Sequence, residues 1–126
     1  MTLRHCDLLL SGGKLLCMDD ADTQLRYGAV AVTDGKIVEI GTRDALRQKY
    51  SAKEEIHHEN AILLPGLIDA HMHETLTRGL HEDLPLMRWL TEVCYPVEGA
   101  YRPDDLTAAA LMTQAELIRG GVTTFI

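Results

Sequence analysis

The sequence PGLIDAHMH, at residues 65–73, places two histidines directly after a short apolar segment. Pro65 and Gly66 indicate a turn, and the apolar residues that follow them predict a short buried strand. Because side chains two residues apart in an extended chain point to the same side, His71 and His73 can reach one metal ion together. A catalytic metal needs at least one more protein ligand and an open position for water. The stretch therefore predicts half of a metal site.

The residues after this stretch show helix and strand patterns in turn. Apolar residues at helical spacing over 84–93 predict a helix with Asp83 as its N-cap, which Pro96 is expected to close. A longer helix is predicted over 103–119, because it begins with a proline and two glycines stop it. The apolar residues 122–126 predict a second strand. This order predicts a βαβ unit, and catalytic groups gather at the carboxyl ends of such parallel strands.

Short strands separated by turn residues are the pattern of the first 64 residues. Asp34-Gly35 predicts the two-residue turn of a hairpin between strands at 29–33 and 37–40, because this pair accepts positive φ angles. A short helix is predicted after Thr42, which serves as its N-cap. A small β-sheet domain is the expected result.

Two further turns are expected in this region. The sequence SGG at 11–13 is expected to separate two strands. His57 and His58 are adjacent, so in a strand they face opposite ways and cannot easily share a metal ion. We expect both on the surface, before a turn at 59–60.

The composition is that of an ordinary acidic globular protein. Apolar residues make up 46% of the chain, charged residues 25%, and the formal net charge is −7, which argues against a nucleic-acid partner. No apolar run is long enough for a signal peptide or a membrane span, so a cytoplasmic location without membrane contact is expected. Cys6, Cys17 and Cys94 are widely spaced and are expected to be free thiols.

The stretch at 65–73 resembles the end of the first barrel strand in the amidohydrolase superfamily, which has the pattern Pro-Gly-(Leu/Phe)-(Ile/Val)-Asp-x-His-x-His. Every position of that pattern is present. Further segments are similar to the branch that contains the methylthioadenosine/S-adenosylhomocysteine deaminases and the triazine hydrolases. These segments are GGK at 12–14, DGKI at 34–37, LTRG at 76–79, DLPLMRWL at 83–90, YPVE at 95–98 and GGVTTFI at 120–126.

The resemblance implies an α/β fold with two parts. Residues 1–64 would belong to a small β-sandwich domain, and residues 65–126 would form the first βαβ unit of a (β/α)₈ TIM-type barrel. In the resembled family the sandwich is completed by the C-terminal end of the chain. Since a complete barrel takes about 250 residues, we expect this chain to be an N-terminal fragment of a longer enzyme.

The resemblance also implies a metal centre. In the superfamily the His-x-His pair binds one divalent metal ion together with a histidine after the fifth strand and an aspartate after the eighth. Carried over by position, His71 and His73 are metal ligands, and the ion is expected to be zinc, with iron as the alternative. The metal lowers the pKa of bound water, and the resulting hydroxide attacks an sp² carbon that bears an amino or other leaving group. The catalytic residues are expected beyond Ile126, so the fragment alone is expected to be inactive.

The substrate implied for the full-length enzyme is a small molecule. The expected reaction is hydrolytic deamination of a purine nucleoside or a related heterocycle, carried out by a homo-oligomer. Glu98, in the sequence PVE at 96–98, would accept hydrogen bonds from the ribose hydroxyls; a solvated glutamate at a helix end is the alternative. Two nearby side chains are expected to be structural: Arg78 pairs with a carboxylate, and Trp89 packs its helix against the barrel.

Two alternatives to this function remain open. Glu74 follows the second histidine, where the nucleoside deaminases often have a small or apolar residue. That difference leaves open a triazine or pyrimidine-type ring hydrolase of the same superfamily. The second alternative belongs to another class: a non-catalytic, truncated β module with an interaction or structural role.

Overall fold

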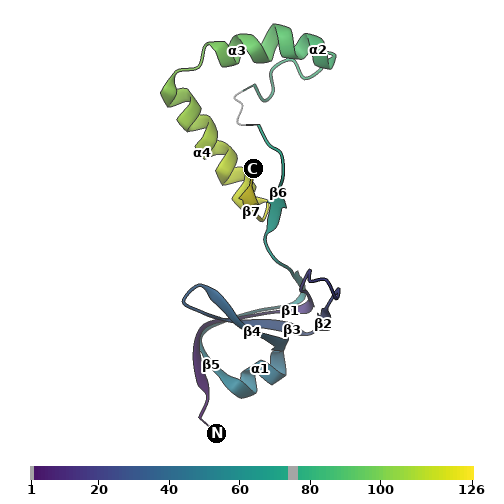
Figure 1. Cartoon of the computed structure of the whole chain (residues 1–126), viewed down its shortest axis with the longest axis vertical. Helices are drawn as coiled ribbons and strands as arrows, with labels where there is room; N and C mark the ends of the chain where they lie inside the picture. The colour runs from purple at the N-terminus through teal and green to yellow at the C-terminus, as the bar shows by residue number, and fades with distance from the viewer. Residues whose placement is uncertain (1, 74–76) are drawn as a thin grey trace. The chain divides into compact units, whose positions relative to one another are not determined.

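The computed structural model describes residues 2–73 and 77–126. They form two compact units, Met1–Pro65 and Gly66–Ile126, and each unit is described here by itself (Figure 1). Among the residues described, no helix is both long enough and apolar enough to cross a membrane.

A curled five-stranded sheet makes up most of the first unit (Figure 1). Its strands are β1 (Arg4–Leu16), β2 (Gln24–Arg26), β3 (Gly28–Thr33), β4 (Lys36–Thr42) and β5 (Tyr50–Leu63), and its helix is α1 (Arg43–Lys49). The order is β2-β1-β3-β4, and β5 pairs with β1 in parallel, whereas the other pairs are antiparallel. The β-sandwich predicted for this region is not confirmed, because the described residues of the unit form a single sheet with one helix.

The core of this unit lies between the sheet and α1. Leu9 on β1 and Leu46 on α1 are each only 1% exposed, and Tyr50 at the start of β5 is buried with them. Cys6 completes the cluster as a small apolar side chain. All three cysteines are free, as the sequence predicts.

Two local predictions for this unit are confirmed. Asp34 and Gly35 have φ angles of 51° and 70° and form the two-residue turn between β3 and β4. The Asp7 carboxylate accepts a hydrogen bond from the Asp34 amide at 2.8 Å, which supports the turn. Thr42 is the N-cap of α1, and its hydroxyl accepts a hydrogen bond from the Ala45 amide at 3.4 Å.

Two turn predictions in this unit are wrong. β1 runs without a break through the glycines at 12 and 13, where it carries only a shift in its register with β5. These glycines therefore do not mark a turn; they allow the two strands to approach closely. β5 likewise continues past His57 and His58 to Leu63, because its pairing with β1 extends as far as Leu15.

Glu39 on β4 ties three other segments of this unit together. One carboxylate oxygen accepts hydrogen bonds from Arg4 at 2.5 Å and from the Tyr50 hydroxyl at 2.9 Å, and the other accepts one from Lys49. The Arg4 guanidinium also lies over the Tyr50 ring, 4.4 Å from its centre. The hydrogen bonds from Lys49 and Tyr50 lower the pKa of Glu39 to about 2.

We expect the Glu39→Gln variant to lose part of the acid sensitivity of this unit. Because folding lowers the pKa of Glu39 from 4.5 to about 2, the stabilisation is present above pH 4.5 and is lost as the pH falls toward 2. Thermal unfolding followed by circular dichroism should show a smaller decrease in melting temperature across that window for the variant. Glu54→Gln, at an exposed site on β5, is the matched control. An unchanged acid dependence in Glu39→Gln would contradict the prediction.

The second unit is a βαβ unit, as predicted, but its first strand is not buried as expected: Leu67 is 49% exposed and Ile68 is 70% exposed, because among the described residues this strand pairs with only one other. β6 (Leu67–Asp69) and β7 (Val122–Phe125) pair in parallel and lie side by side (Figure 1). The helical segments between them are α2 (Leu86–Trp89), the π-helix η1 (Leu90–Cys94), α3 (Tyr95–Gly99) and α4 (Pro103–Arg119). α4 has the predicted bounds, and Gly121 after it adopts a φ of 84°, which favours glycine.

The predicted bounds of the first helical segment are wrong at both ends. It begins at Leu86 with Pro85 as the N-cap residue, and not after Asp83. Pro96 does not close it, because α3 contains Pro96 near its start. The π-helical turn of η1 ends two residues before this proline, and its wider hydrogen bonding helps to accommodate a residue that has no N–H to donate.

Candidate metal site

The strand that leads to the histidine pair is held by its neighbour. The Leu67 amide donates to the Gly121 carbonyl at 2.9 Å, and the Ile126 amide donates to the Asp69 carbonyl at 3.1 Å. Asp69 is the last residue of β6 and lies opposite Phe125 on β7. The histidines thus follow the carboxyl end of a parallel strand, where α/β folds place catalytic groups.

The structure brings His71 and His73 together. Their Nε2 atoms are 3.0 Å apart, their ring centres are 4.7 Å apart, and the ring planes are inclined by 81°. At this distance the two nitrogens are within hydrogen-bonding range, and the tautomer of each ring decides which one donates. Both side chains are exposed. Because β6 ends two residues before His71, the alternation of side chains within a strand is not what aligns the pair.

The convergent nitrogens fit a shared metal ion. Zinc binds imidazole nitrogen at about 2.0–2.1 Å, so two tetrahedral ligand atoms lie about 3.3 Å apart. The observed Nε2 separation of 3.0 Å differs from this by only a few tenths of an ångström. With both Nε2 atoms unprotonated, a slight rotation of the rings would present both nitrogens to one ion.

The other candidate ligands are not gathered around this pair. Within residues 2–73 and 77–126, no group of three or more His, Cys, Asp or Glu side chains is arranged to hold a metal ion. Glu74, which departs from the pattern of the nucleoside deaminases, lies outside the described residues. The part of the chain that the structure describes therefore presents a two-ligand arrangement.

Glu98 lies on α3, and its side chain is exposed. Its backbone carbonyl accepts a hydrogen bond from the Tyr101 amide at 3.2 Å as the helix ends. No described hydrogen bond or ion pair connects Glu98 to the histidine pair. Its side chain can accept hydrogen bonds from a ligand, but the structure does not test its predicted contact with ribose.

Residues 77–80 are held to the helices of the second unit. Arg78 forms an ion pair with Glu116 on α4, which confirms the pairing predicted for it and raises the pKa of Arg78. The indole N–H of Trp89 donates to the Leu80 carbonyl at 2.9 Å, so this side chain holds the preceding loop to α2. Cys94, on η1, is buried, and its Sγ lies 3.9 Å from the Thr77 hydroxyl. Sequence reasoning missed this last contact, for which neither residue gives a local signal.

Sequence reasoning also missed a contact of Asp69. Its carboxylate oxygen accepts a hydrogen bond from the His71 backbone amide at 3.1 Å. An aspartate two residues before the bonded amide is a known signal for such a turn, so the sequence did contain this information.

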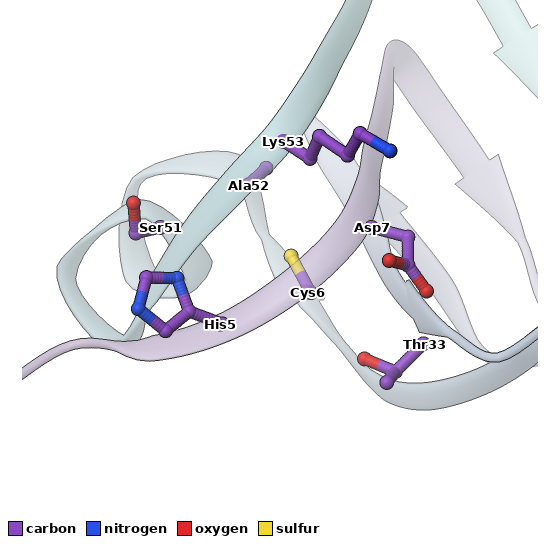
Figure 2. Close-up of a pocket in the computed structure, with 7 residues that line it drawn as sticks. All are labelled: His5, Cys6, Asp7, Thr33, Ser51, Ala52 and Lys53. Carbon is purple, nitrogen blue, oxygen red and sulfur yellow. The ribbon is translucent and has the colours of Figure 1, made fainter.

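A separate hollow of about 450 Å³ lies on the first unit (Figure 2). His5, Cys6, Asp7 and Lys53 are among the residues that line it. Burial raises the pKa of the Cys6 thiol, and the nearby carboxylates of Asp7 and Glu55 raise it further. The thiol is therefore protonated and unreactive near neutral pH, which argues against a nucleophilic site in this hollow.

Known protein families and individual relatives match both parts of the chain. The sequence model of the amidohydrolase family matches residues 62–126, and that of the imidazolonepropionase-like composite domain of bacteria matches residues 28–50. A 5-methylthioadenosine/S-adenosylhomocysteine deaminase from Nitratidesulfovibrio vulgaris is 39% identical over 97% of this chain and 28% of its own length. The chain thus spans little more than a quarter of the curated relatives that it matches.

Solved structures similar to this one include an adenosine deaminase and a triazine hydrolase. An adenosine deaminase from Xanthomonas campestris with bound zinc is 34% identical, with a TM-score of 0.89 over 98% of this chain and 29% of the other. A triazine hydrolase from Arthrobacter aurescens is 26% identical, with a TM-score of 0.75 over 94% of this chain and 27% of the other.

Proposed function

Because the chain belongs to the amidohydrolase family, we propose that it supplies the metal-binding start of a hydrolase that removes the amino group of a purine nucleoside or a related heterocycle. In this proposal the first unit is part of a β-sandwich and the second unit begins the (β/α)₈ barrel. The observation that carries the proposal is the convergence of His71 and His73 at the end of β6, with their Nε2 atoms 3.0 Å apart.

His71 and His73 would hold one divalent ion, zinc or alternatively iron, through their Nε2 atoms. Zinc is favoured by the bound zinc in the similar adenosine deaminase. When bound, such an ion activates water for attack on an sp² carbon. In this proposal β6, which is paired with β7, would position the two imidazoles, and their exposed side chains would leave room for a substrate beside the ion. The remaining ligands and the proton-transfer groups would come from residues that these 126 do not include.

Glu98 is proposed to bind substrate. Its exposed carboxylate could accept two hydrogen bonds from neighbouring hydroxyls, as a ribose presents them. The end of a short helix presents this side chain without burying it. Glu98 would then orient the nucleoside without taking part in the chemical step.

Nucleoside deamination is favoured over triazine hydrolysis by the pattern of identities. The relative named as a methylthioadenosine/S-adenosylhomocysteine deaminase is 39% identical and the adenosine deaminase 34%, whereas the triazine hydrolase is 26% identical. Triazine-type ring hydrolysis remains the second candidate, because the triazine hydrolase structure still matches 94% of the chain. Both reactions are hydrolytic attack on a nitrogen-bearing ring, so the proposed metal pair would serve either.

A zinc titration of the whole chain tests the metal pair. Two-dimensional NMR of the histidine ring nitrogens separates His71 and His73 from the other four histidines, and both Nε2 signals should shift together as Zn²⁺ is added. Changing both residues to alanine should abolish this binding. The double change His5→Ala and His58→Ala, at exposed positions of the first unit, is the matched control. Zinc binding that survives the loss of His71 and His73 would contradict the proposal.

The reaction itself is tested in a chimera. This chain would replace the matching segment of the Nitratidesulfovibrio deaminase, which spans 28% of that protein. The chimera should bind zinc and deaminate 5′-methylthioadenosine, measured by the change in ultraviolet absorbance. The His71→Ala and His73→Ala changes should remove zinc and activity together. A folded, zinc-loaded chimera that hydrolyses a triazine but no nucleoside would overturn the proposed substrate class.

A further inference from the structure

Asp69 is placed between the anchored strand and the histidine pair. The backbone of Asp69 belongs to the sheet. Its carbonyl oxygen accepts a hydrogen bond from the Ile126 amide at 3.1 Å, and the residue lies opposite Phe125 on β7. The Asp69 side chain contacts the residues that follow the strand: one carboxylate oxygen accepts a hydrogen bond from the His71 backbone amide at 3.1 Å. Asp69 is therefore joined both to the barrel strand and to the first of the two histidines.

This hydrogen bond sets the direction in which the chain leaves β6. An aspartate that accepts the amide two residues later closes a turn, and this fixes the backbone at the intervening residue. The two imidazoles follow at once, and their Nε2 atoms meet at 3.0 Å although β6 has already ended. A turn held by a side chain therefore lies directly before the pair, at the point where the strand ladder has ended.

We propose that Asp69 is the positioning residue of this metal pair, and that it acts through its hydrogen bond to the His71 amide and not through its charge. The inference rests on the proposed function, since it assigns Asp69 to the same site. A carboxylate near a cation would also attract it electrostatically, so geometry and charge must be separated by experiment. Asparagine allows this separation, because its side-chain oxygen forms the same turn without a charge.

The experiment is a Zn²⁺ titration of the whole chain and of two variants, followed through the ring nitrogens of His71 and His73. Asp69→Ala should raise the dissociation constant about tenfold, a typical effect of losing a group that orients a metal ligand. The variant should also lose the Nε2 contact between the two rings before any metal is added. Asp69→Asn should keep that contact and bind Zn²⁺ within about threefold of the unaltered chain.

Folding of the variants has its own readout. The Ile126 amide donates to the backbone of Asp69, so its protection from hydrogen exchange should be the same in all three proteins if β6 and β7 remain paired. Asp83→Ala, at an exposed loop position, is the matched control and should leave the affinity unchanged.

Each result has a distinct meaning. If Asp69→Asn loses as much affinity as Asp69→Ala while Ile126 stays protected, charge and not the turn is responsible, and the inference is overturned. It is also overturned if Asp69→Ala binds Zn²⁺ as tightly as the unaltered chain. If the unaltered chain shows no response of His71 and His73 to Zn²⁺, it is the proposed metal pair itself that fails.

Discussion

Replacing Gly66 by alanine is expected to separate β6 from β7 and to destroy the alignment of the histidine pair. A Cβ atom on Gly66 would lie 2.1 Å from Oγ1, 2.3 Å from Cγ2 and 2.7 Å from Cβ of Thr123. Real Cβ atoms essentially never show contacts below 3.0 Å. Rotating the Thr123 side chain cannot clear the overlap, because its own Cβ is fixed to the backbone of β7.

This overlap would destabilise a sheet of only two strands, β6 and β7. Overpacking of this kind costs about 1–3 kcal/mol, and a two-stranded pairing is only marginally stable by itself. We expect the Gly66→Ala variant to lose hydrogen-exchange protection at Leu67 and Ile126, whose amides bridge the two strands. Zinc affinity at His71 and His73 should fall with it, because Asp69 would no longer be anchored.

A matched glycine and a rescue variant make this prediction specific. A Cβ atom on Gly99, at the end of α3, would meet nothing within 4 Å, so Gly99→Ala should leave β6 and β7 paired. Adding Thr123→Ala to Gly66→Ala removes Oγ1 and Cγ2 and should restore part of the protection. Full protection in the Gly66→Ala single variant would show that the strands can shift apart at little cost, contrary to the prediction.

This steric requirement gives the Pro-Gly start of the motif a physical meaning. From the sequence, Gly66 indicates only a turn, whereas the structure shows that its missing side chain makes room for Thr123 of the parallel partner. Thr123 lies 57 positions later in the chain, because a helical crossover separates parallel strands. Sequence patterns describe neighbours along the chain, so a close approach of this kind is visible only once the strands are paired.

The features predicted correctly are those with local causes. Asp34-Gly35 forms its turn from its own φ preferences, and Thr42 caps α1 through an amide three residues away. The failures at Pro96 and at Gly12-Gly13 have the opposite origin. Whether Pro96 ends a helix depends on the π-turn before it, and whether the glycines form a turn depends on the distant strand β5.

In the candidate site, too, the features with local causes could be predicted and those that depend on distant residues could not. His71 and His73 could be predicted as a pair because they are two residues apart, and the structure brings them together. The structure does not test the predicted role of Glu98, since a substrate contact depends on groups that come from other parts of the fold. The turn formed by Asp69 could have been predicted from the sequence. Its connection with the histidine pair becomes clear only when β6 is known to end at that residue.

Replacing Gly13 by alanine is expected to lower the free energy of unfolding of the first unit. A Cβ atom there would lie 2.0 Å from the carbonyl oxygen of Glu59 and 3.2 Å from its carbonyl carbon, both in the backbone of β5. The Gly13 carbonyl also accepts the Tyr27 amide at 2.8 Å, so β1 is held from the other side and cannot easily move away. The overlap should cost about 3 kcal/mol, at the upper end of overpacking effects.

Urea unfolding can measure this cost against an internal reference. The only tryptophan, Trp89, lies in the second unit, so its fluorescence reports that unit, while strand circular dichroism and amide exchange in β1 and β5 report the first. Gly13→Ala should lower the unfolding midpoint of the first unit and leave the Trp89 transition unchanged. Gly41→Ala is the matched control, because its Cβ would meet Leu46 at 3.4 Å, an ordinary contact, and it should cost less than about 1 kcal/mol. Equal midpoints for the two variants would mean that β1 and β5 can separate locally without loss of stability, and the tight register shift at these glycines would then have no energetic role.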